Sequence, residues 1–390
     1  MLNIDEPAHM QPKLALFRLG FRPFFLFGSL FSIFALPLWI LSLKGEIQFT
    51  PHGSSVWWHS HEMLFGFVAA IVVGFLLTAV QNWTGRPGLK GFSLMILFVV
   101  WLLPRILLLN QNWLPLSIVA TLDLLFLPLA ALVMAKAVVP IKQWRNFGFV
   151  PILLILTLTN ACSYLGLWQQ NTFLINLAFH TAVLVITVIV TMIGGRVIPF
   201  FTDKASNWQR QPAINLIEKL TFASLGSLIV AVILQQHELI RLMAAIAAVT
   251  IFCRWFRWGW QHTFKTPLLW SLHFSYLFIP IGLLIIAVGL PISSGIHAIT
   301  VGGMGGMILA MMARVSLGHT GRQLQPPKAV VIGFGLMITA AACRTSANII
   351  PQFYLSLIIA AATLWVIAFA CFIICYGPML CKPRVDGRPG

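Results

Sequence analysis

Three histidines in apolar segments share one spacing, and that spacing is compatible with a metal site. His61, His180 and His297 each precede a threonine by 22 or 23 residues, and each threonine lies where its segment ends near basic residues. If these segments are helices, the three imidazoles lie at a similar depth. Neutral imidazole binds copper, iron and zinc, so we expect these histidines to hold a metal. Hydrogen-bonded packing is the alternative for each of them.

Two carboxylates also lie inside the apolar segments. Glu62 directly follows His61 and comes one helical turn after His59, where it can orient an imidazole, ligate a metal or pass a proton. Asp123 is the other acid well inside such a segment. Because ionisable groups are costly in a bilayer, Glu62 and Asp123 are our candidates for a proton path and for catalysis. A buried hydrogen bond is the alternative for Asp123.

Further histidines could hold a second group. His59 lies about 200° around a helix from His61, so the two imidazoles are expected to serve different partners. His273 falls inside a later apolar segment and His319 in a loop, and these two could form a second site. Alternatively, His273 is a proton relay or a packing residue, and His319 caps its loop.

Two arginines lie near the predicted outer ends of their segments. Arg105 and Arg344 carry guanidinium groups that could bind the two propionates of a haem through paired hydrogen bonds. Snorkelling of the long side chain to the membrane surface is the alternative. The glycine-rich run 302–306 after His297 lets a flat ligand or another helix approach the backbone, and helix packing is the commoner cause.

The elements that position these side chains must be membrane helices. A chain of 390 residues that is 59% hydrophobic and 9% charged cannot cover itself with a soluble surface. It predicts an all-α polytopic bundle of about twelve transmembrane helices, each needing roughly 20 apolar residues, in a single transmembrane domain over residues 1–390. The predicted spans are 21–43, 59–81, 92–109, 114–137, 147–168, 171–193, 213–235, 238–252, 267–290, 294–312, 328–347 and 351–376.

The net charge of +16 is explained by topology. With the N-terminus inside, 21 of the 25 Lys and Arg residues fall on the cytoplasmic side, and Lys44, Arg105, Arg241 and Arg344 do not. This positive-inside pattern places both termini in the cytoplasm, and it leaves no reason to expect a nucleic-acid partner. The segment before Phe21 has no short apolar core, so we do not expect a cleaved signal peptide.

The common spacing of the three histidines also suggests an internal repeat. The histidine helices are the second, sixth and tenth predicted spans, so the chain could consist of three repeats of four helices.

Six cysteines include no CxxC pair and are expected to be free thiols. Cys371 and Cys375 lie one turn apart and could meet a soft metal, although buried cysteine is usually a small apolar residue.

Several motifs together resemble one family. They are residues 58–66 (WHSHEMLFG), 77–85 (LTAVQNWTG), 194–202 (GGRVIPFFT) and 317–322 (LGHTGR), supported by 21–25 (FRPFF) and 269–273 (LWSLH). In this order they resemble the NnrS family of bacterial membrane proteins. The resemblance implies a twelve-helix protein of the bacterial inner membrane that contains haem and copper and is associated with nitric oxide metabolism and nitrosative stress.

Combining the resemblance with the residues gives a specific hypothesis. We expect a haem b and a copper ion in the outer half of the bundle, binding nitric oxide that partitions into the membrane. Copper would take some of the three equally spaced histidines, and the haem would be held by His59 or His273 with Arg105 or Arg344 on its propionates. Glu62 could deliver protons if the gas is reduced, as in a nitric oxide reductase.

Electrons would have to come from outside the chain. No CxxCH haem attachment, iron–sulfur cysteine set or flavin fingerprint is present, so a quinol or a protein donor is expected. The alternatives are a transporter or a metal- or haem-handling protein without redox turnover, and a sensor that binds nitric oxide and signals through a partner.

Overall fold

The computed structural model describes residues 15–387, and every regular element within them is a helix. Eleven of these helices are long and apolar enough to cross a membrane, and Gly91–Leu107 is a shorter apolar helix. The prediction of an all-α polytopic membrane bundle is therefore confirmed. Asp5, Glu6, Lys13 and Arg388, which entered the arguments on the N-terminus and the topology, lie outside the described residues.

The chain separates into two compact units, each with its own internal contacts. The first contains residues 15–179, 315–324 and 372–387, and the second contains residues 180–314 and 325–371. The single transmembrane domain and the three repeats of four helices stay predictions.

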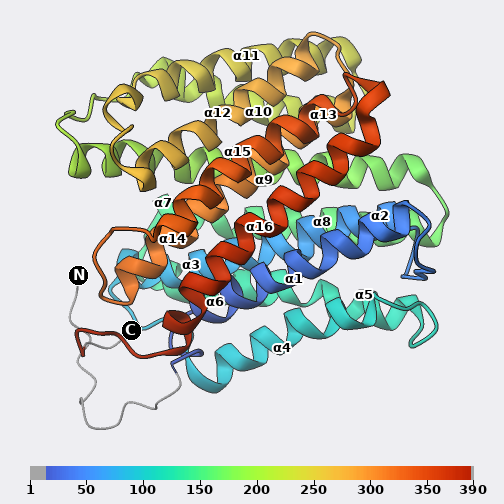
Figure 1. Ribbon diagram of the computed structural model, residues 1–390, viewed down its shortest axis with the longest axis horizontal. Helices are drawn as coiled ribbons and strands as arrows, with labels where there is room; N and C mark the ends of the chain where they lie inside the picture. Colours follow the sequence, from blue (N-terminus) through green and yellow to red (C-terminus); the bar gives the residue numbers. More distant parts are fainter. Residues whose placement is uncertain (1–14, 388–390) are drawn as a thin grey trace. The chain divides into compact units, whose positions relative to one another are not determined.

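In the first unit, α3 packs between α1 and α6, and α6 packs in turn on α8. The shorter helices α4 and α5 pack on each other (Figure 1). The elements are α1 (Phe21–Leu43), α2 (Ser55–His61), the π-helix η2 (Glu62–Val68), α3 (Ala69–Thr84), α4 (Gly91–Leu107), α5 (Leu116–Leu124), α6 (Phe126–Val138), η3 (Val139–Ile141), α7 (Trp144–Phe147) and α8 (Phe149–Trp168).

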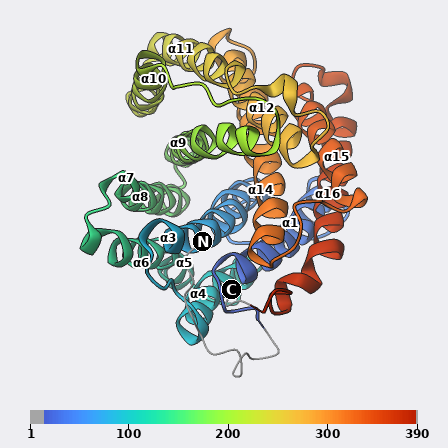
Figure 2. The same cartoon turned by 90° about the vertical axis from the view of Figure 1, so that its left-hand side faces the viewer.

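In the second unit, α10, α11 and α12 pack in chain order, and Figure 2 shows α10 and α11 side by side. The π-helix η5 packs between α12 and α15. The elements are α9 (Thr172–Ala205), α10 (Asn215–Ile233), α11 (His237–Phe256), η4 (Trp260–His262), α12 (Pro267–Ala287), α13 (Ile292–His297), η5 (Ala298–Gly306), α14 (Met307–His319), α15 (Lys328–Ser346), η6 (Pro351–Phe353) and α16 (Tyr354–Cys381). Helices α9, α14 and α16 each contribute residues to both units.

Three predicted ends of spans are wrong. The tenth span does not end at Met312, because α14 continues to His319, which is therefore the last residue of a helix and not a loop residue as predicted. The sixth span does not end at Ile193, because α9 continues to Ala205 and buries Ile198 completely. The eighth span does not end before Arg254, because α11 continues to Phe256 and Arg254 is paired with a glutamate there. In the sequence, Arg254 predicts the end of a membrane helix because burying an unpaired guanidinium group is costly. Its ion pair offsets much of that free-energy cost.

Two of the three histidine helices change their winding directly after the histidine. The π-helix η2 begins at the residue after His61, and η5 begins at the residue after His297. A π-turn is rare, and it adds a residue to the turn and changes the direction of the side chains that follow. The third histidine, His180, lies in α9, which is α-helical throughout.

The glycine run 302–306 lies within η5, and its role is helix packing. A Cβ on Gly302 would overlap the ring of Phe278, and a Cβ on Gly305 would overlap Trp365 and the end of Met337. These neighbours belong to α12, α16 and α15, so side chains of three helices pack directly against the backbone of the run.

We expect Gly305→Ala to lower the free energy of unfolding by about 1–3 kcal/mol, because the added methyl group must displace a packed indole ring. Thermal unfolding of the detergent-purified protein measures this change. Gly335→Ala is the matched control, since a Cβ on Gly335 in α15 meets nothing within 4 Å. Equal unfolding temperatures for the two variants would contradict the packing role.

Candidate functional site

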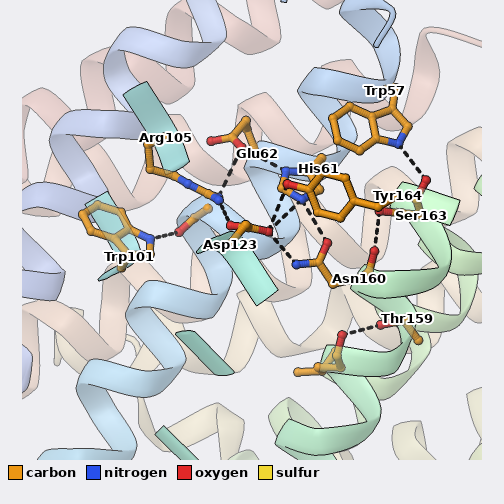
Figure 3. A network of polar contacts seen from close by, with 12 residues as sticks. Trp57, His61, Glu62, Trp101, Arg105, Asp123, Thr159, Asn160, Ser163 and Tyr164 are labelled. Carbon is orange, nitrogen blue, oxygen red and sulfur yellow. Dashed lines mark hydrogen bonds and ion pairs between the residues drawn. The ribbon is translucent and has the colours of Figure 1, made fainter. Parts of the chain in front are cut away.

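His61 is the centre of a buried polar network in the first unit (Figure 3). It is the last residue of α2, and its side chain is fully buried. Its Nδ1 lies 2.9 Å from Oε1 of Glu62. Its Nε2 lies 2.9 Å from Oδ1 of Asn160 and 3.2 Å from Oδ2 of Asp123. Both ring nitrogens therefore face oxygen atoms, an arrangement that accommodates a proton on each nitrogen.

Arg105 joins the two carboxylates of this network. Its Nη2 forms an ion pair with Oδ1 of Asp123, and its Nη1 lies 3.2 Å from Oε1 of Glu62. All three side chains are buried. Helix α4 carries Arg105 near its C-terminal end, and one turn earlier Trp101 donates a hydrogen bond of 2.8 Å to the carbonyl of Gly66. This bond holds the end of α4 against η2.

Helix α8 supplies the remaining polar groups. Asn160 donates a hydrogen bond of 2.7 Å through Nδ2 to Oδ2 of Asp123, which leaves the amide oxygen directed at His61. Tyr164, one turn later, donates a bond of 3.2 Å to the same carboxylate oxygen. Trp57 stacks on the imidazole of His61 with a centroid distance of 4.7 Å. Asp123 thus accepts bonds from two helices besides its own.

Gly66 makes room for the network inside the π-turn. A Cβ at this position would lie 2.8 Å from Nη1 of Arg105 and 2.9 Å from Oε2 of Glu62. The π-helix η2 and its glycine together let a guanidinium group lie against the backbone next to a carboxylate. No larger residue fits at this position without moving one of the two charges.

A charge count indicates that the network can hold one exchangeable proton. With both carboxylates ionised and only Arg105 positive, the cluster would carry one net negative charge in a buried site, which is costly. One proton, on His61 or on a carboxylate, makes it neutral. Oε2 of Glu62 is buried without a hydrogen-bond partner among the described residues, so it is an acceptor available to that proton.

Four of the predicted site residues lie together in the network, namely His61, Glu62, Arg105 and Asp123. The proton-path prediction for Glu62 and Asp123 is untested, but the two share Arg105. A haem propionate on Arg105 would have to displace these carboxylates. Sequence reasoning missed the network residues of α8; the signal was a pair of polar residues four positions apart, Asn160 and Tyr164, in an apolar helix.

Two further predicted metal ligands, His180 and His297, lie in the second unit, together with the predicted haem ligand His273. His180 is half-buried in α9, and Nδ1 of His297 lies 2.6 Å from the carbonyl oxygen of Ser293. His273 is fully buried; its Nε2 lies 2.9 Å from Oγ1 of Thr202, and its Nδ1 has no hydrogen-bond partner among the described residues.

The remaining candidates have separate surroundings. His59 stacks on Trp39 with a centroid distance of 4.0 Å, so it does have a different environment from His61. The ring of His319 lies 5.6 Å from that of Phe21. Arg344 is buried and donates a hydrogen bond of 3.2 Å to Asn348.

The described part of the chain contains no group of three His, Cys, Asp or Glu residues arranged to hold a metal ion. The donor atoms fit haem and copper unequally. His61 does not fit a copper ligand as it stands, because both of its ring nitrogens are engaged by oxygen atoms. The unpartnered Nδ1 of His273 does fit a single metal bond. None of the six cysteines forms a disulfide bond, as predicted.

The fold and this network define a polytopic helical membrane protein with a buried charged cluster in one of its units. The family model described as "NnrS protein" matches residues 15–384, which is nearly the whole chain. The protein therefore belongs to the NnrS family, as the motifs predicted. A search of curated proteins found no match.

We expect Asp123→Asn to destabilise the protein by about 3–5 kcal/mol, because it leaves Arg105 buried without its main counter-ion. Thermal unfolding measures this loss. Glu238→Gln is the control, since that carboxylate is exposed and lies 3.9 Å from its arginine partner. A loss no larger than that of the control would show that the ion pair does not hold the unit together.

Proposed function

We propose that this protein binds nitric oxide within the bacterial inner membrane and consumes it, with haem b and copper as its cofactors. Its membership of the NnrS family supports the link to nitric oxide. The observation that carries the proposal is the buried network of His61, Glu62, Arg105 and Asp123, which has the composition of a proton-supplying site. Such consumption would protect the cell against nitrosative stress.

Proton supply is what the chain itself would contribute to the reaction. Reduction of two nitric oxide molecules to nitrous oxide and water consumes two electrons and two protons. Nitric oxide is small and enters an apolar bilayer readily, whereas a proton needs a chain of acceptors. In this proposal, Glu62 receives a proton on Oε2 and exchanges it with His61, while Arg105 lies between the two carboxylates and offsets their charge.

Haem and copper, when bound, would bind the gas and pass electrons to it. His273 is the best-fitting protein ligand, because its Nδ1 is buried and unpartnered. Four other histidines remain candidate ligands, although no further His, Cys, Asp or Glu residues of the described chain complete a metal site around them. They are His59, His180, His297 and His319. Electrons would come from a quinol or a protein partner, and we place both termini in the cytoplasm as the basic loops indicate.

The first experiment records reduced-minus-oxidised spectra of detergent-purified, cofactor-supplied protein before and after adding nitric oxide. We expect a haem band that shifts with the gas, and we expect His273→Ala to reduce the haem content. Copper is measured by elemental analysis of the same sample. Folded protein with no haem band would overturn the haem assignment.

Glu62→Gln tests the proton role. We expect nitric oxide consumption to fall by about 10²–10⁴-fold, the usual contribution of a general acid or base, while the haem spectrum stays unchanged. Glu46→Gln is the matched control, because Glu46 is an exposed glutamate paired with Lys44 outside the helices. Unchanged consumption in Glu62→Gln would remove Glu62 from the reaction.

A transporter is the second candidate, and one observation favours it. Helices interrupted at matching positions often mark the substrate site of a transporter, and η2 and η5 interrupt two histidine helices directly after the histidine. Reconstituted vesicles separate the two functions: a transporter would accumulate a solute without consuming nitric oxide. Consumption without solute uptake would reject it.

A further inference from the structure

The second unit contains a basic pocket that the proposed function does not use. Its cavity volume is about 50 Å³, and it opens between the N-terminal end of α10 and the C-terminal end of α11, beside α9. Three arginines and one glutamate line it. The lining residues that matter here are Gly195, Arg210, Ala213, Glu218, Arg254 and Arg257.

One arginine of the pocket is neutralised and fixed. Arg254 binds Glu218 through two bonds, Nε to Oε1 at 2.7 Å and Nη2 to Oε2 at 3.0 Å. Its Nη1 lies 3.3 Å from the hydroxyl of Tyr276, and its side chain is buried. Gly195 permits this position, because a Cβ there would overlap the guanidinium group. The pair forms a rigid, neutral part of the wall.

The other two arginines leave the pocket with a net positive charge. Arg257 donates one hydrogen bond of 3.2 Å to the carbonyl of Pro212, and the backbone N–H of Arg210 donates to Asp203. Neither guanidinium forms an ion pair within residues 15–387. With Arg254 cancelled by Glu218, the lining carries two uncompensated positive charges, which match a phosphate group.

The start of α10 adds hydrogen-bond donors to the same place. Its N-cap, Ile214, supplies no side-chain bond, so the first N–H groups of the helix have no acceptor in the helix itself. Ala213, Ile214 and Ile217 line the pocket. The positive end of the helix dipole therefore adds to the charge of the arginines.

We propose that this pocket binds a phosphate group. Two sources share that chemistry, the headgroup of an anionic phospholipid and a soluble phosphate. Apolar side chains at the helix start, Ile214 and Leu216, are exposed and suit the edge of a bilayer. Basic pockets between helices on the cytoplasmic side are typical sites for anionic headgroups, and the predicted topology assigns the segment before α10 to that side.

The test uses the full-length protein in detergent and native mass spectrometry. The protein is equilibrated with equal amounts of phosphatidylglycerol and phosphatidylcholine, and the retained lipids are counted. We expect the wild type to retain more phosphatidylglycerol than phosphatidylcholine. In the double variant Arg210→Gln/Arg257→Gln, we expect the ratio of the two retained lipids to fall by about tenfold or more. Ala213→Glu adds a negative charge at an exposed lining position and should act in the same direction without disturbing the fold.

A control and a second probe complete the design. Arg86→Gln removes an exposed arginine of the first unit and should leave the preference unchanged. Inorganic phosphate is titrated into delipidated protein in parallel; binding that the double variant weakens, without a lipid preference, supports the soluble source. Wild-type protein that prefers neither probe, or a preference that the double variant retains, would overturn the proposal.

Discussion

The cost of burying charge in an apolar protein is the constraint on which the first unit depends. Asp123 and Glu62 are acceptable there only because Arg105 lies between them, and Arg105 is acceptable only because both carboxylates meet it. Each member comes from a different helical element, so the pairing also fixes where η2, α4 and α5 meet. In the second unit, Glu218 neutralises the buried Arg254 in the same way.

Composition and hydropathy were sufficient to predict the helical membrane class and the spans. A transmembrane helix is recognisable from local sequence, because it needs only a long apolar run, and every expected span corresponds to a helix. The ends of the spans were predicted wrongly where tertiary contacts change the free-energy cost of burying a charged side chain. Arg254 looked like a helix end because its partner Glu218, 36 residues away, could not be identified from the sequence.

The site was predictable only in part, for a related reason. His61, Glu62, Arg105 and Asp123 were identified because ionisable residues in apolar segments are conspicuous. Their mutual contacts were not predicted, since these depend on helix rotation and on a π-turn that has no simple sequence signal. The helical-wheel argument for His59 and His61 holds, because both precede the π-turn.

The π-turns also have a consequence for how the two helices can vary. Because successive residues of an α-helix differ by about 100° in direction, an inserted or deleted residue normally rotates everything beyond it. A π-turn absorbs one such residue locally, and η2 does so between His61 and the inner half of its helix. The π-turn thus lies between the end of the helix that carries His61 and the end that carries Thr84. Removal of one residue within residues 62–68 would therefore convert the π-turn into α-helix and leave the directions of both ends unchanged.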